Sequence, residues 1–131
     1  MNEDFRVNHR GMNNRAKGRA GESMAEEYLA VRGYNILEKN YRNRFGEIDI
    51  IAKDGNTFVF IEVKTRNTSL HGLPADAVDI RKQGRIGRVA LYYITVKKIG
   101  DHPCRFDVLS ISDDRVELIK DAFDIPDELL W

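Results

Sequence analysis

The chain has 131 residues, of which 42% are hydrophobic and 32% charged, and its 21 basic and 21 acidic side chains balance. This composition is typical of one globular domain and excludes a disordered chain, because there is enough apolar material to offset chain entropy. No uncharged stretch reaches ten residues, whereas a membrane-spanning helix needs about 20, so we expect no membrane partner, and with no apolar leader after Met1 we expect a cytoplasmic protein.

The N-terminal part begins with an irregular segment and continues as a helix. Residues 1–13 are polar and aperiodic, and we interpret them as a flexible N-terminal arm. Asn13 or Asn14 can cap a helix that starts near Arg15. Its apolar residues recur at helical spacing until Gly33, which is expected at the C-cap.

Three strand patterns follow the helix, over residues 34–41, 46–53 and 57–65. Residues 54–56 have the sequence Asp-Gly-Asn and form a strong hairpin signal between the last two strands. These two strands are nearly continuous apolar runs, a pattern typical of central strands that are covered on both faces.

The C-terminal part predicts a second helix and one or two more strands. Helical spacing runs from residue 75 to about residue 98, although two glycines interrupt it. A strand pattern covers residues 105–111, and a weaker one covers residues 116–120.

The order α-β-β-β-α-β, with one optional further strand, predicts an α/β fold of the α+β type, in which helices pack on a mixed sheet. We expect a single domain over residues 14–121 and an acidic tail over residues 122–131.

Charge is segregated along the chain although the net charge is zero. Residues 1–100 carry 18 basic and 12 acidic side chains, and residues 101–131 carry three basic and nine acidic ones. Between Arg81 and Lys98 there are six basic residues and no acidic one. Such a block is typical either of a phosphate-binding face or of an ordinary solvated helix face.

Three charged residues, Asp49, Glu62 and Lys64, interrupt the apolar strands of the predicted hairpin. If residues 55–56 form the loop, Asp49 lies directly opposite Glu62, and if residues 54–55 form it, Asp49 lies diagonal to Glu62. In both registers the side-chain alternation puts all three on one face of the sheet.

Two carboxylates that face each other across a strand pair repel, and a divalent cation removes the repulsion. Mg²⁺, or Mn²⁺ in its place, suits one or two carboxylates together with water and phosphate oxygens. We therefore predict that Asp49 and Glu62 bind a metal ion, with Glu22 of the first helix as a third acid. Lys64 would orient or deprotonate the attacking water or stabilise charge on phosphorus. The alternative is a charged surface hairpin without a ligand.

Short motifs around this pattern cover the chain from about Lys17 to Leu109. They are residues 18–25 (GRAGESMA), 33–37 (GYNIL), 40–42 (NYR), 46–49 (GEID), 60–66 (FIEVKTR), 77–78 (AV), 82–83 (KQ) and 105–108 (RFDV). Together they resemble the bacterial UPF0102 or YraN family, which is usually placed in the PD-(D/E)xK nuclease superfamily near the archaeal Holliday junction resolvases.

This resemblance implies a restriction-endonuclease-like αβββαβ core with a metal site. It maps Asp49 and Glu62 to the two acids, Lys64 to the lysine and Glu22 to the helix glutamate of the resolvase branch. Ile48 stands where the motif has proline, and proline is not a metal ligand.

Basic and polar residues near these acids are candidate nucleic-acid contacts. Arginine matches phosphate geometry and none of these positions is specific for a base, so we expect recognition of backbone or shape. The candidates are Arg42, Arg44, Arg66, Lys82, Gln83, Arg85 and Arg88, with Arg81 extending the track. For Lys82 and Gln83, exposed positions on a helix without a ligand are an equal alternative. Glu47 is expected to face solvent at a strand end, and Asp107 to form a salt bridge within the fold.

The predicted function is that of a Mg²⁺-dependent endonuclease acting on DNA, including branched or structured DNA. Junction resolution needs two active sites, so such an enzyme would be a homodimer. A nucleic-acid-binding module that does not cut is the alternative. A protein-interaction scaffold that works through the acidic residues 121–131 is a third interpretation.

Overall fold

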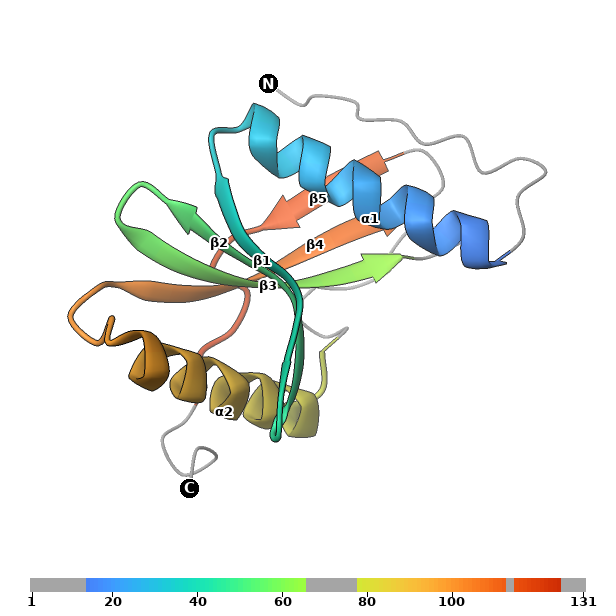
Figure 1. Ribbon diagram of the computed structural model, residues 1–131. Helices are drawn as coiled ribbons and strands as arrows, with labels where there is room; N and C mark the ends of the chain where they lie inside the picture. The colour runs from blue at the N-terminus through green and yellow to red at the C-terminus, as the bar shows by residue number, and fades with distance from the viewer. Residues whose placement is uncertain (1–13, 66–77, 113–114, 126–131) are drawn as a thin grey trace.

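The computed structural model describes residues 14–65, 78–112 and 115–125 (Figure 1). The elements in chain order are α1 (Asn14–Val31), β1 (Asn35–Asn43), β2 (Gly46–Asp54), β3 (Thr57–Thr65), α2 (Ile80–Lys97), β4 (Cys104–Ser112) and β5 (Arg115–Ile119). The predicted order, including the optional last strand, is confirmed. The expected N-terminal arm, Arg66 and most of the acidic tail lie outside the described residues. No helix in the described ranges is long and apolar enough to cross a membrane.

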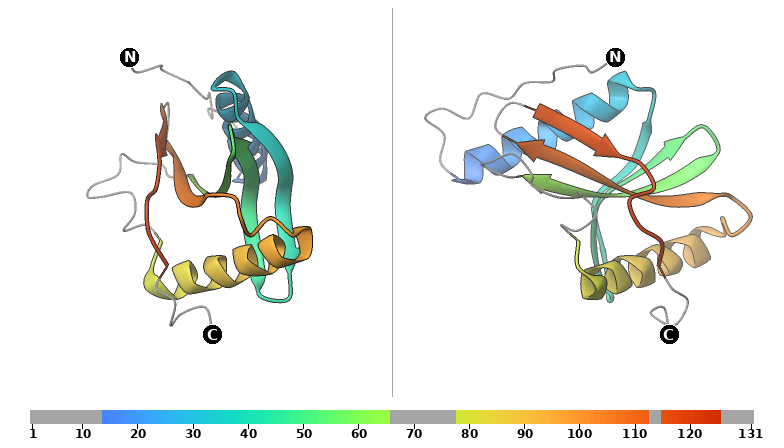
Figure 2. Two further views of the ribbon diagram at one scale, coloured as in Figure 1. Left: turned by 90° about the vertical axis from the view of Figure 1, so that its left-hand side faces the viewer. Right: turned by 180° about the vertical axis from the view of Figure 1, so that it is seen from behind.

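The five strands form one mixed sheet in the order β1-β2-β3-β4-β5. Strands β3 and β4 are parallel, and the other neighbouring pairs are antiparallel. A parallel pair needs a long crossover connection, and α2 lies within that connection. Figures 1 and 2 show α1 and α2 on opposite sides of the sheet, so the central strands are covered on both faces as predicted.

Each helix buries a separate apolar cluster against its face of the sheet. On the α1 side, Ala25, Tyr28 and Leu29 of the helix pack with strand residues that include Ile50 and Ile61. The residues on the α2 side are Ile86, Val89, Ala90 and Tyr93 of the helix with Ile48, Ile51, Phe60 and Val108 of the strands. The two clusters hold the helices in place on either side of β2 and β3.

Local signals define most of the helix ends. Gly33 has a φ of 85° and follows α1 as the predicted C-cap, and the Tyr34 N–H donates to the Leu29 carbonyl at 3.0 Å. The second helix begins at Ile80, so the prediction of a start near residue 75 was wrong for the described residues 78 and 79. Asp79 is extended, and its carboxylate caps the helix by accepting the Lys82 N–H at 2.9 Å.

The β2–β3 hairpin has the first of the two registers considered above. Asp54 pairs with Thr57, so residues 55–56 form the loop, and Gly55 has a φ of 61°. Glycine at the first central position with positive φ is typical of a type II′ hairpin turn.

The hairpin opens into a fork at its other end. The paired register ends at Ile50 and Ile61, one position before Asp49 and Glu62 would face each other. Ile50 packs on the α1 side, whereas Ile48 packs on the α2 side, so the alternation of side chains along β2 is broken at Asp49. Figure 1 shows β1 and β2 bending together toward α2 while β3 continues beside β4.

Irregularities in β1 accompany this bend. The register of β1 against β2 shifts between Ile36 and Glu38, and Asn40 has a left-handed φ of 50°. An irregularity of this kind bends and twists its strand. The fork therefore lies beside the irregular segment of the edge strand.

Candidate functional site

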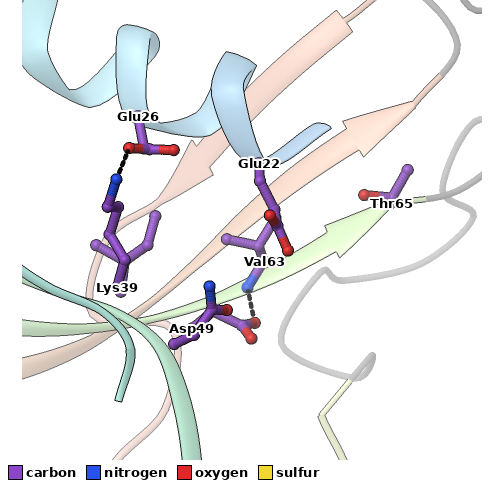
Figure 3. Close-up of a pocket in the computed structure, with 8 residues that line it drawn as sticks. Glu22, Glu26, Lys39, Asp49, Val63 and Thr65 are labelled. Atoms are coloured by element: carbon purple, nitrogen blue, oxygen red, sulfur yellow. Dashed lines mark hydrogen bonds and ion pairs between the residues drawn. The ribbon is translucent and has the colours of Figure 1, made fainter. Parts of the chain in front are cut away.

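Asp49 lies at the fork between β2 and β3. Its Oδ2 accepts the backbone N–H of Val63 at 2.8 Å (Figure 3). A buried backbone N–H needs an acceptor, and here the Asp49 side chain supplies one where the β2–β3 ladder has ended. The bond fixes the carboxylate between the two separating strands.

The surroundings of Asp49 oppose its negative charge. Burial raises the pKa of Asp49 from the ordinary value of 3.8 to about 6, and the nearby charge of Glu62 acts in the same direction. The hydrogen bond from Val63 and the charge of Lys82 oppose this rise in pKa. Asp49 is therefore held beside Glu62 in a partly buried position, where two negative charges oppose each other. A bound divalent cation relieves this repulsion.

Glu62 is buried, with 7% of its side chain exposed, and lysines neutralise it. Its Oε1 lies 2.6 Å from Lys82 Nζ and 3.9 Å from Lys64 Nζ. Burial lowers the pKa of Lys82, but its hydrogen bond to Glu62 and the charge of that acid outweigh burial and raise it above the ordinary value. Lys82 is therefore an ammonium group at neutral pH.

The prediction placed Asp49, Glu62 and Lys64 on one face of the sheet. The side chains of Glu62 and Lys64 do lie together, on the α2 side. Asp49 lies where the two faces meet, because β2 bends there. It lines one cavity on the α1 side of the sheet and a second on the α2 side. The fork thus brings Asp49 near Glu22 on the α1 side and near Glu62 and Lys82 on the α2 side.

The cavity on the α1 side, here the α1 cavity, has a volume of about 250 Å³. Glu22 and Glu26 of α1 line it together with Asp49 and Thr65 (Figure 3). Glu26 is ion-paired with Lys39 at 2.9 Å, whereas Figure 3 shows Glu22 over the part of the cavity that holds Asp49.

Gly21 lets α1 approach the end of β3. A Cβ atom at Gly21 would lie 3.1 Å from Thr65 Oγ1, tighter than most real contacts of this kind. The absence of a side chain at Gly21 therefore suits the close approach of α1 to Thr65, and the sequence pattern alone gave no role to this glycine.

The cavity on the α2 side, here the α2 cavity, has a volume of about 230 Å³ and is lined by Asp49, Glu62, Lys82 and Arg85 among others. Arg85 also lines a wider groove of about 550 Å³ along the first half of α2. We call this the arginine groove, and its lining residues are Asp79, Ile80, Arg81, Gly84, Arg85 and Arg88. The acids and the arginines are therefore adjacent, and Arg85 belongs to both.

The remaining candidates are engaged in contacts within the fold. Arg42 is exposed and pairs with Glu47 at 2.8 Å, which agrees with the expectation that Glu47 faces solvent. Arg44 lies over the ring of Phe45. Gln83 donates its side-chain N–H to the Val78 carbonyl at 2.8 Å.

Asp107 forms the internal salt bridge that was predicted for it. Its side chain is fully buried and pairs with Arg105 Nε at 3.1 Å. The contact between Lys82 and Glu62, by contrast, was missed. No local signal could have found it, because the two residues are 20 positions apart and belong to different elements.

The three predicted metal ligands do not converge on one point. Among the residues that the structure describes, no three acidic, His or Cys side chains come close enough together to hold a metal ion. Asp49 and Glu62 nevertheless fit the simpler type of Mg²⁺ site, in which one or two carboxylates are supplemented by water and substrate oxygens. The charge conflict at Asp49 is the observation that supports this fit.

The five-stranded mixed sheet with helices on both faces defines an α+β protein whose core is compatible with the restriction-endonuclease-like arrangement. The sequence model of the family described as "Uncharacterised protein family UPF0102" matches residues 21–111. The chain belongs to this family.

Relatives match over most of their length. A UPF0102 protein of Syntrophus aciditrophicus is 52% identical over 112 residues, which cover 82% of this chain and 88% of that protein. One of Thermodesulfovibrio yellowstonii is 51% identical over 106 residues, which cover 81% and 94%. Among solved structures, Pyrococcus furiosus SfsA in complex with Ca²⁺ matches 88% of this chain and 68% of its own, with 12% identity and a TM-score of 0.36, too distant to carry an inference.

Proposed function

We propose that this protein is a divalent-cation-dependent endonuclease that hydrolyses phosphodiester bonds in DNA. The observation that carries the proposal is the pair Asp49 and Glu62 at the fork, where Asp49 is held with a raised pKa beside a second carboxylate. Lys64 and Lys82 contact Glu62, and the arginine groove lies next to it. These cations favour a polyanionic substrate. A surface hairpin without a ligand would gain nothing from this costly arrangement.

Each side chain has a role that follows from its surroundings. Asp49 and Glu62 would hold Mg²⁺ or Mn²⁺, and Glu22 could reach the ion through water from the α1 cavity. The bound ion would polarise the phosphate and lower the pKa of the attacking water. Lys64 lies close to Glu62 and would stabilise the charge that develops on the phosphate oxygens.

The arginine groove would hold the sugar-phosphate backbone next to the acids. Arg85 lines both the groove and the α2 cavity, so a backbone lying on α2 could place one phosphate at Asp49 and Glu62. Arginine contacts to phosphate carry no base information, which favours recognition of shape. Branched DNA is the substrate that the resemblance to the archaeal resolvases favours, and its resolution would require a homodimer.

The test begins with calorimetric titration of Mg²⁺ and Mn²⁺ into the wild type and the Asp49→Asn/Glu62→Gln double variant. We expect saturable binding by the wild type that the double variant loses. Glu117→Gln, an exposed acid on β5, is the matched control and should bind like the wild type. Binding that the double variant retains would contradict the assignment of the site.

Cleavage of a four-way DNA junction, a duplex and a single-stranded RNA is then compared in the same proteins. The proposal expects cation-dependent cleavage of DNA that the double variant lacks, with a dimer in sedimentation if the junction is resolved. A protein that binds DNA in a salt-dependent way, equally well in the double variant, and never cleaves would instead be a non-catalytic binding module.

A further inference from the structure

We infer that Lys82 and a divalent cation exclude each other at Glu62, and that cation binding releases the Lys82 side chain to bind a substrate phosphate. The inference deepens the proposed function and rests on it, because it concerns the same two carboxylates. It makes Lys82 a positioning residue that links the binding of the cation to the binding of the nucleic acid.

The contact between Lys82 and Glu62 is the first observation. Lys82 Nζ lies 2.6 Å from Glu62 Oε1, and the Glu62 side chain is 7% exposed. A Mg²⁺ ion would need to lie about 2.0–2.1 Å from the same carboxylate. An ammonium group and a divalent cation held this close in a partly buried cavity repel strongly, so they compete for Glu62.

The structure also provides a way for Lys82 to leave. Asp79 holds the backbone N–H of Lys82 at 2.9 Å and the Lys82 side chain takes no part in that cap, so the helix start stays fixed when the side chain rotates. One third of the Lys82 side chain is exposed, and lysine has a flexible stem with rotatable donors. The exchange therefore needs no movement of α2.

The side of the α2 cavity to which Lys82 can turn holds a second cation, Arg85. Lys82 lines the α2 cavity with Arg85, and Arg85 continues into the arginine groove. Once it has left Glu62, the ammonium adds one more charge to the surface beside Arg85. A phosphate of the nucleic acid is the ligand class that suits two neighbouring cations at the edge of a carboxylate site.

Cation and nucleic acid should then bind cooperatively. A cation at Glu62 makes the Lys82 charge available to a phosphate, and a phosphate that holds Lys82 leaves Glu62 available to a cation. Linkage requires the two effects to be equal. In the absence of either ligand, Lys82 keeps the buried Glu62 neutralised.

The first test is calorimetric titration of Mg²⁺ and Mn²⁺ into the wild type, Lys82→Met, Lys82→Gln and Arg81→Met. Arg81 is the matched control, because it lies one residue earlier on α2 and lines the arginine groove but not the α2 cavity. Both Lys82 variants lose the ammonium charge that competes with the cation for Glu62, so both should bind the cation more tightly, by roughly tenfold or more. Loss of a screened charge in Arg81→Met should change it by less than about threefold.

The second test measures the binding of a labelled four-way DNA junction with and without Ca²⁺, which replaces Mg²⁺ to limit cleavage. The cation should strengthen DNA binding by the wild type and Arg81→Met, and this gain should be lost in Lys82→Met. Lys82→Gln keeps a donor for Glu62 and serves as the folded variant if Lys82→Met fails to fold, which thermal melting followed by circular dichroism reports.

The outcomes separate the inference from the proposed function. If the wild type binds cations through Asp49 and Glu62 but the Lys82 and Arg81 variants change affinity equally, only the inference is overturned. A DNA-binding gain that survives in Lys82→Met overturns it as well. If no protein, Lys82→Gln included, binds Mg²⁺ or Mn²⁺ with or without DNA, the proposed metal site fails and the inference with it. Cation binding that appears only in the Lys82 variants supports the exchange.

Discussion

Asp49 has a raised pKa because the fold places it, partly buried, at the point where β2 leaves β3 and beside Glu62. The folded protein binds the Asp49 proton more tightly than the unfolded chain does. Its ionisation therefore costs stability, and this cost grows as the pH rises from about 4 to about 6 and persists above that range.

Replacing Asp49 by asparagine should therefore stabilise the protein at neutral pH in the absence of divalent cations. With a pKa raised to about 6, we expect the variant to gain about 1–3 kcal/mol at about pH 7.5. At about pH 4 most of the gain should disappear, because Asp49 is then mostly protonated in the folded protein and about half protonated in the unfolded chain. Urea denaturation across this range measures the difference.

Glu117→Gln serves as the control, because it also removes one carboxylate, from an exposed position on β5. A variant at Asp49 that is less stable than the wild type at neutral pH would show that the bond from Val63 outweighs the cost of the charge.

At the scale of the elements, α2 depends on its first turn to place Lys82 and Arg85. Asp79 caps this turn, and the Lys82 N–H holds the pKa of Asp79 below its usual range. Asp79→Ala should lower Tm by about 3–5 °C, because the helix loses its cap. Differential scanning calorimetry provides the measurement.

Asp79→Ser should recover most of the lost Tm, since serine is also a good N-cap. If the alanine and serine variants melt at the same temperature, the cap contributes nothing and the start of α2 must be held by packing alone.

Elements were predictable wherever a local signal defines them. The bounds of β3 agree with the prediction at both ends, because alternation and the turn at residues 54–56 are encoded within a few positions. Gly33 likewise ended α1 where expected. The later start of α2 depends on Asp79, which the extended helical periodicity had concealed.

The site was predictable in its residue types but not in its geometry. The charged residues in apolar strands identified Asp49 and Glu62, and the turn gave a register that holds as far as Ile50. The fork could not be predicted, because it depends on the bend of β1 and on packing against α2. The partner of Glu62, Lys82, comes from a helix that only the tertiary fold brings to the sheet.

For the whole molecule, a partly buried charge network joins segments that are far apart in the chain. Arg105 contacts Asp107 at 3.1 Å, Asp54 at 3.0 Å and the Tyr34 hydroxyl at 2.5 Å. The N–H of Asp121 also donates to Asp107, at 2.9 Å. These bonds connect the start of β1, the hairpin, β4 and the segment after β5.

Arg105→Met should destabilise the protein by about 3–5 kcal/mol, since it leaves the fully buried Asp107 without a counter-charge. Chemical denaturation measures this loss. Arg105→Lys keeps the charge but not the planar fork, so its stability should lie between those of the wild type and Arg105→Met. A loss below about 1 kcal/mol would mean that the network behaves like a surface ion pair.

The segment after β5 also contributes to the core, although the acidic tail was expected to begin at residue 122. The Ala122 N–H donates to the Phe106 carbonyl at 2.8 Å, and the rings of Phe106 and Phe123 stack with centroids 5.5 Å apart. Phe123→Ala should cost about 1–3 kcal/mol in urea denaturation through lost apolar burial and stacking. The exposed neighbour Asp124 is the control, and Asp124→Ala should have little effect.

The hydrogen bond from Val63 to Asp49 gives the site a spectroscopic reporter. Because the Val63 amide donates to the carboxylate, its cross-peak in a ¹H–¹⁵N correlation spectrum should shift with the charge of Asp49. The same peak should respond when a cation or a proton enters the fork. The amide of Val59, which pairs with Ala52 in the middle of the regular ladder, provides an internal reference. One backbone resonance could therefore follow the state of the acid in solution without substrate, dye or chemical label.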